Sequence, residues 1–184
     1  EKNFGDRVIP NYHFDKANYI VSFNADFLGT WISPTEYSRQ FAQGRKIKDV
    51  NNPRMSRLVT VESHMSLTGT NSDNRILVKP SQQGVAIAHL YNKVVGAGVS
   101  TTGLNAKAKK ALDKVAKDLF AAGSSLIVSS SNDTNEQLMV NAINNRLGNY
   151  GKTLGFSGAS LQRQGDDKDL TQLVAEMANG SIDT

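Results

Sequence analysis

The chain has 184 residues, of which 39% are hydrophobic and 21% charged, and its formal net charge at pH 7 is +4. This length suits one domain of ordinary size with a buried core. The balance of 21 basic against 17 acidic residues is too small to indicate nucleic-acid binding by itself. The sequence contains no cysteine, which excludes disulfides and cysteine-ligated zinc or iron–sulfur clusters within these residues. It also has no apolar run near the roughly 20 residues that span a bilayer.

The sequence begins with Glu1 rather than methionine and ends in ANGSIDT, directly after an amphipathic segment. We therefore expect a piece of a longer protein, with targeting signals that lie outside it. Within the piece we expect a lead-in segment over residues 1–16 and one α/β domain over residues 17–184.

Short apolar runs rich in β-branched residues alternate with longer segments of helical periodicity. In chain order, strands are predicted for YIVSF (19–23), RLVTVE (57–62), RILVK (75–79) and SLIVSS (125–130). Helices are predicted over residues 33–46, 82–96, 105–123, 135–149 and 168–180. The first has Ser33 as a possible N-cap, Pro34 at the first helical position and Glu36 three residues after the cap. This alternation predicts an α/β fold with three layers and a mostly parallel, Rossmann-like sheet.

Three polar loops follow predicted strands, over residues 24–33, 62–73 and 129–135. In parallel sheets ligands bind beyond the carboxyl ends of the strands, so these loops are the candidate binding region. Their Ser, Thr and Asn side chains could bind phosphate or ribose oxygens, or they could simply cap helices and turns. Composition alone favours capping. Residues 96–106 are the best candidate for a flexible loop.

Several conspicuous residues have ordinary structural explanations. His13, His64 and His89 lack metal-ligand spacing, and His89 lies in an apolar helical segment, where a packed or hydrogen-bonded role is favoured. Trp31, beside Phe27, is expected to anchor its loop to the body of the domain. The sequence contains neither a Walker motif nor a dinucleotide-binding glycine fingerprint.

A basic stretch runs from Arg39 to Arg57, with six cationic residues against the single carboxylate of Asp49. It could dock an acidic partner subunit or a phosphate, or it could be a solvated connector between a helix and a strand. The connector is favoured because charged runs usually serve solubility. Few aromatic residues are interleaved, so single-stranded nucleic acid is not an expected partner.

Three segments resemble the molybdopterin oxidoreductases of the dimethyl sulfoxide reductase type. They are YIVSFNADFLGTWISPTEYSRQF, RLVTVESHMSLTGTNSDNRILVKPSQQGVAIAHL and AINNRLGNYGKT, in the order and spacing of that family. The stretch IPNYHFDKANYIVSFNADFLGTW is more closely similar to the large iron–sulfur subunits of alternative complex III, which are part of quinol-oxidising bacterial membrane complexes. The resemblance implies a fold like the first three domains of formate dehydrogenase or dimethyl sulfoxide reductase.

The resemblance also implies which residues would hold a molybdopterin guanine dinucleotide. The family-equivalent positions are Asn24, Glu62, His64, Thr68 and Gln83. Glu62 keeps the acid that would reach the ribose, and Thr68, Asp73 and the glycine turn at Gly148 are also retained. Gln83, however, replaces the Asp that would pair with guanine N–H groups, and His64 replaces an Arg. A carboxylate accepts two such bonds with charge assistance, whereas an amide offers one acceptor oxygen, so the site is weakened.

These departures lead us to expect a non-catalytic scaffold without molybdenum cofactor, among the other subunits of a membrane respiratory complex. Iron–sulfur clusters would lie elsewhere in the parent chain. By resemblance alone, the location would be the periplasmic side of the bacterial inner membrane, without a membrane span in this piece. Two alternatives stay open: one lobe of an active bis-pterin molybdenum oxidoreductase, and a nucleotide-binding module without a redox role.

Overall fold

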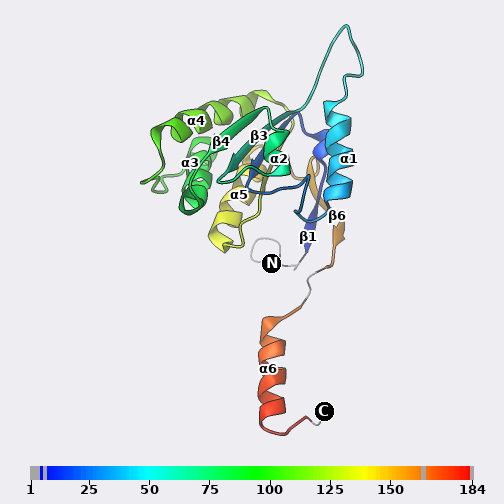
Figure 1. Cartoon of the computed structure of the whole chain (residues 1–184), viewed down its shortest axis with the longest axis vertical. Coiled ribbons are helices and arrows are strands. Elements are labelled where there is room, and N and C mark those ends of the chain that lie inside the picture. The colour runs from blue at the N-terminus through cyan, green and yellow to red at the C-terminus, as the bar shows by residue number, and fades with distance from the viewer. Residues whose placement is uncertain (1–4, 6–7, 163–164, 183–184) are drawn as a thin grey trace. The chain divides into compact units, whose positions relative to one another are not determined.

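The structure is a computed structural model that describes residues 5, 8–162 and 165–182 (Figure 1). The chain divides into two units. The larger is Tyr12–Gly155, and the smaller combines Glu1–Asn11 with Phe156–Thr184. The elements of the larger unit are, in chain order, η1 (Phe14–Lys16), β2 (Tyr19–Phe23), α1 (Pro34–Arg45), β3 (Arg57–Glu62), α2 (Leu67–Thr70), β4 (Asn74–Leu77), η2 (Pro80–Gln82), α3 (Gln83–Val95), α4 (Ala106–Ala121), β5 (Ser125–Ser129) and α5 (Thr134–Arg146).

The larger unit is built on a four-stranded sheet with the order β4-β3-β2-β5. All the pairings are parallel, and Val21 in β2 lies opposite Val59 in β3 and Ile127 in β5. When these four strands are renumbered 1 to 4 in chain order, starting from β2, their order in the sheet is 3-2-1-4. The strand order of a doubly wound Rossmann sheet starts in the same way. The predicted α/β class and parallel sheet are therefore confirmed, and the fold is compatible with a Rossmann-like one.

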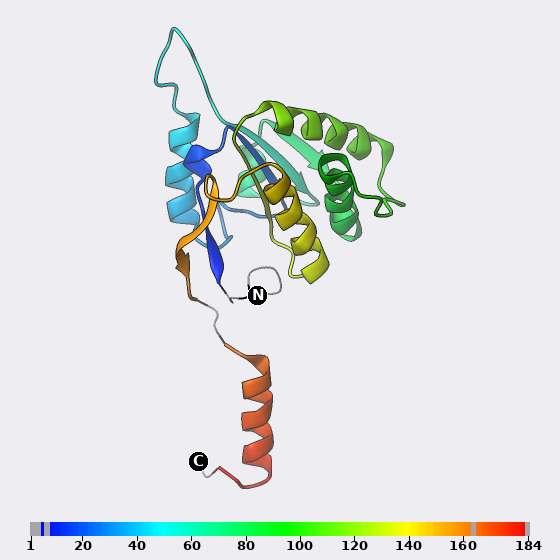
Figure 2. The ribbon, with the colours of Figure 1, turned by 180° about the vertical axis from the view of Figure 1, so that it is seen from behind.

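Alternate residues of β2, β3 and β5 face two separate hydrophobic clusters. In β2, Tyr19, Val21 and Phe23 belong to one cluster, which also holds buried residues of α3, α4 and α5. Ile20 belongs to the other cluster, with residues of η1 and α1. Figures 1 and 2 show α1 apart from the group formed by α3, α4 and α5. Burial on both faces explains why the runs of these three strands are almost continuously apolar, whereas β4, at the edge of the sheet, buries only Ile76.

The long helices follow their predicted apolar stripes. In α4 the buried residues are those of the predicted stripe, Ala108, Leu112, Val115, Ala116 and Leu119. Its N-cap is Asn105, whose side chain accepts a hydrogen bond from the Ala108 N–H at 2.7 Å. Ser33 occupies the predicted N-cap of α1, but its side chain makes no capping bond, and Pro34 provides the helical start.

The outer edge of β5 is closed by side chains rather than by another strand. Asn144 of α5 accepts a hydrogen bond from the Ile127 N–H at 3.1 Å and donates one to the Ile127 carbonyl at 2.8 Å. Asn149 donates to the Asn144 side-chain oxygen at 2.8 Å and accepts from the Ser125 hydroxyl at 3.0 Å. The amide of Asn144 thus imitates a neighbouring strand and satisfies an edge that would otherwise be open.

The smaller unit includes most of a two-stranded sheet of β1 (Ile9–Tyr12) and β6 (Leu154–Ser160), which the sequence did not predict. It also contains α6 (Asp167–Ala178), which confirms the helix predicted over residues 168–180. The predicted stripe of α6 is exposed in the structure: Leu170, Leu173, Val174 and Met177. In the part of the chain that the structure describes, no helix combines the length and apolar character needed to cross a bilayer.

Candidate functional site

The candidate site lies where β2, β3 and β5 end, because their carboxyl ends meet at one edge of a parallel sheet. The strand order reverses between β2 and β5, which is where open α/β sheets usually bind ligands. The expected residues Asn24 and Glu62 stand at the ends of β2 and β3, and the others lie on the segments that follow β3 and β4.

Glu62 uses both carboxylate oxygens within the protein. Its side chain is 2% exposed. Oε1 accepts a hydrogen bond from Arg75 Nε at 2.5 Å, and Oε2 accepts one from the Ser66 hydroxyl at 2.6 Å. The same Ser66 oxygen caps α2 by accepting from the Gly69 N–H at 2.9 Å. Both Arg75 and Ser66 would compete with a ribose for this carboxylate.

Thr68 is also engaged, through a partner that the sequence analysis missed. Its backbone N–H and its hydroxyl both donate to Asp26 Oδ1, at 2.8 and 2.7 Å. The hydroxyl also accepts from the Leu28 N–H at 3.0 Å. Asp26 therefore fastens the loop after β2 to helix α2. The NADF stretch shows an acid after a strand, but nothing in the sequence identifies Thr68 as its partner.

Asn24 and Gln83 meet at one carbonyl group. The Asn24 N–H donates to the Val61 carbonyl at 2.9 Å, and Gln83 Nε2 donates to the same oxygen at 3.3 Å. Asn24 has a left-handed backbone with φ of 53°, a conformation that asparagine tolerates better than most residues. Gln83 Oε1 is buried and has no hydrogen-bond partner among the described residues. It is thus an unused acceptor beside the end of β3.

His64 does not join these groups. It is exposed in the turn after β3 and makes no hydrogen bond or ion pair with any residue that the structure describes. The structure therefore brings Asn24 and Gln83 together at Val61. It places Glu62 and Thr68 around the short helix α2 and leaves His64 outside both groups.

The start of α5, beside the strand-order reversal, is already capped. Asp133 accepts hydrogen bonds from the N–H groups of Asn135 at 2.8 Å and Glu136 at 3.0 Å. Free N–H groups at a helix start are what phosphates commonly bind. Here a carboxylate occupies them, and its negative charge would repel a phosphate.

Two residues that the resemblance associates with the pocket lie at the opposite edge of the sheet. Asp73 precedes β4 and accepts from Arg45 at 2.7 and 3.0 Å and from the Leu58 N–H at 2.7 Å. Desolvation raises the pKa of Asp73, but these hydrogen bonds and the charge of Arg45 outweigh it and hold the pKa below its ordinary value. Gly148 ends α5 with φ of 66°, next to Asn149, which bonds to the start of β5.

A hollow of about 490 Å³ lies near the ends of β3 and β4. It is lined by Ser63, Leu77, Val78, Lys79, Pro80, Gln82 and Asn105. None of the five expected cofactor residues lines it. The hollow is therefore not the pocket that the resemblance implies.

The described contacts do not fit the guanosine end of a molybdopterin guanine dinucleotide. Such a group needs a carboxylate for ribose and acceptors for guanine N–H groups, whereas Glu62 and Thr68 are committed to internal partners. Gln83 Oε1 is the exception among these three groups.

Within the described residues no group of three His, Cys, Asp or Glu side chains could hold a metal ion. No protein-family model matches the sequence, and no curated protein matches it either.

The residues given ordinary structural roles adopt them. His89 Nε2 lies 2.9 Å from Asp113 Oδ1, and the ring is 7% exposed on helix α3. Trp31 packs against the rings of Tyr12 and Tyr37, with centroids 5.0 and 5.9 Å away. The prediction that Trp31 anchors its loop is thereby confirmed.

Proposed function

We propose that this chain is a molybdopterin-oxidoreductase-like domain that serves as a non-catalytic scaffold and does not hold the pterin cofactor. The observation that carries the proposal is the engagement of Glu62, whose two oxygens are taken by Arg75 and Ser66. The four-stranded sheet, with a hydrophobic cluster on each face, is consistent with a three-layer domain of this kind.

Freeing Glu62 for a ribose would be costly. The carboxylate is 2% exposed, so it would lose Arg75 or Ser66 while remaining away from water. A buried charge that loses its partner is destabilised by several kcal/mol. A ribose hydroxyl offers a neutral hydrogen bond in return, which is weaker than the charge-assisted one from Arg75. The present arrangement therefore favours the internal hydrogen bonds of Glu62 over the binding of a nucleotide.

The scaffold role places the chain within a larger assembly. We propose that it is part of a membrane-associated, quinol-oxidising electron-transfer complex on the periplasmic side of the bacterial inner membrane. Its partners would be the other subunits of that complex, and iron–sulfur clusters elsewhere in the parent chain would carry the electrons. This part of the proposal rests on the sequence resemblance.

One observation favours a second candidate, a guanine-nucleotide site that is still able to bind. Gln83 Oε1 is a buried acceptor without a partner among the described residues, and a guanine N–H could supply the missing donor. Such a site would suit either one lobe of an active molybdenum oxidoreductase or a plain nucleotide-binding module.

A thermal melt of the chain with and without GDP separates these candidates. A ligand at 100 times its Kd stabilises by about 2.7 kcal/mol, which shifts Tm by about 5–10 °C for a chain of this size. The scaffold predicts no shift with about 1 mM GDP. A shift in Tm that disappears in Gln83→Leu would establish the nucleotide site and refute the proposal that this site does not bind a nucleotide.

A further inference from the structure

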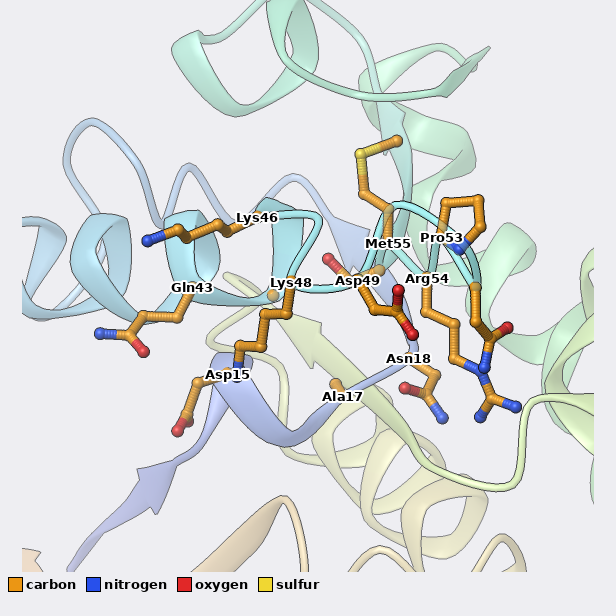
Figure 3. A pocket seen from close by; sticks show the side chains of 13 residues that line it. Asp15, Ala17, Asn18, Gln43, Lys46, Lys48, Asp49, Pro53, Arg54 and Met55 are labelled. Atoms are coloured by element: carbon orange, nitrogen blue, oxygen red, sulfur yellow. The ribbon is translucent and has the colours of Figure 1, made fainter.

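A hollow of the larger unit lies at the amino ends of the strands, opposite the candidate site. It has a volume of about 830 Å³. One side is formed by residues 15–18, which lead into β2, and the other by residues 43–56, which leave α1 and enter β3 (Figure 3). This second side contains most of the basic stretch noted in the sequence.

Three cations line the hollow and have no side-chain partner among the described residues. Lys46, Lys48 and Arg54 line it, and none forms an ion pair or a side-chain hydrogen bond with a described residue. In Figure 3 the side chains of Lys48 and Arg54 extend toward the side formed by residues 15–18, whereas Lys46 points away along α1. Asp15 and Asp49 also line the hollow, so its walls carry three cationic and two acidic side chains.

Exposed apolar side chains stand on the same loop. Ile47 is 50%, Met55 51% and Val50 87% exposed, so the loop presents apolar groups to solvent beside its cations. Such a mixture is typical of a surface that a protein partner covers. A connector that served only solubility would not need these apolar groups.

The hydroxyl of Ser56, in the wall of the hollow, also has no partner within the described part of the chain. Ser56 is 6% exposed, and its Oγ makes no hydrogen bond within the part of the chain that the structure describes. Buried hydroxyls normally have partners. An acceptor that entered the hollow could supply one, and a carboxylate is the acceptor that the neighbouring cations favour.

We propose that this hollow and the loop Lys46–Met55 dock an acidic protein segment that also carries apolar side chains. Its carboxylates would pair with Lys48 and Arg54, and its apolar groups would cover Ile47 and Val50. Nucleic acid is disfavoured because none of the described residues that line the hollow is aromatic, so none could stack on a base. A membrane surface is disfavoured because it would touch the projecting loop and leave the concavity unfilled. The proposal names a docking surface for the scaffold role but does not depend on the absence of molybdenum.

Binding of a labelled peptide tests the proposal. The probe is a helical peptide of about a dozen residues in which glutamates flank a leucine stripe, and its control replaces every glutamate by glutamine. The protein variants are the double change Lys48→Glu with Arg54→Glu, and the matched pair Lys107→Glu with Lys110→Glu on the exposed face of α4. Fluorescence anisotropy measures Kd at low and high salt, and circular dichroism verifies that each variant is folded.

We expect the glutamate peptide to bind with a Kd in the micromolar range and more weakly at high salt. The glutamine peptide should bind at least tenfold more weakly, as should the Lys48/Arg54 double variant. The α4 pair should behave like the unchanged chain. If both double variants lost the same affinity for the glutamate peptide, the peptide would be attracted by the overall charge of the protein. That result would overturn the proposed docking site.

Three further results would also overturn the proposal. The first is no binding up to about 1 mM peptide, where the free energy of binding is only about −4 kcal/mol. The second is displacement of the peptide by millimolar inorganic phosphate, which would indicate a small-anion site. The third is binding to phosphatidylserine vesicles in preference to the peptide. A positive peptide result together with a GDP shift would leave this docking site intact and remove only the scaffold proposal.

Discussion

Replacing Asn144 by alanine should strongly destabilise the larger unit. The side chain is 1% exposed and closes the edge of β5 through the N–H and carbonyl groups of Ile127. It also accepts from the side chain of Asn149, which is 1% exposed. The substitution thus leaves three buried polar groups without their partner. At about 1–3 kcal/mol for each unsatisfied group, and with some relief from entering water, we expect a loss of about 3–6 kcal/mol.

Urea unfolding, followed by the fluorescence of the single tryptophan, Trp31, measures this loss. With a slope of about 1–3 kcal/mol per molar urea, a loss of 3 kcal/mol lowers the midpoint by at least about 1 M. The matched control is Asn145→Ala, one residue along α5, where the side chain is exposed and the change should stay within about 0.5 kcal/mol. If Asn144→Ala and Asn145→Ala have the same midpoint, the amide does not close the strand edge and the reasoning is refuted.

Two further substitutions test contacts at the two edges of the sheet. Gly69→Ala should cost about 1–3 kcal/mol, because a Cβ there would lie 1.9 Å from Glu62 Oε1; Gly98→Ala, with open space around it, should be nearly neutral in the same urea assay. Asp73→Asn should cost about 0.5–1.5 kcal/mol at pH 7, because the residue is exposed and solvent screens its ion pair. Because the folded-state pKa of Asp73 is lowered, its contribution is present above the ordinary carboxyl pKa and is lost as the pH falls through the lowered value. The difference in urea midpoint between Asp73→Asn and the unchanged chain should therefore shrink in acid, and a constant difference would contradict the ion-paired state.

The periodicity of the sequence was sufficient for the four strands and the long helices of the larger unit, but it did not predict the short α2, η1 and η2. The strands β2, β3 and β5 are apolar on both faces, and the helices show stripes such as that of α4, so local pattern and buried position agree. The β1–β6 pairing could not be predicted in this way. LGFSGAS alternates weakly and carries two glycines, and its partner IPNY lies far away in the sequence. Pairing between distant segments depends on the assembled fold rather than on either segment alone.

The position of the loops after the strands was predictable, but their contacts were not. The loops after parallel strands were correctly expected to meet at one edge, and Asn24 and Glu62 lie there. The partners of Glu62 and Thr68 were not predictable, because Arg75 and Asp26 reach them only through the register of β3 with β4 and the turn after β2. Residues that appear free in a sequence can thus be fully used within the fold.

The measurement that tests the central claim most directly is the metal content of the natural protein that contains this chain, purified from its source and analysed by mass spectrometry. The scaffold proposal predicts iron without molybdenum. Stoichiometric molybdenum would contradict it, and it would mean that Gln83 and His64 are tolerated variants in a working cofactor pocket.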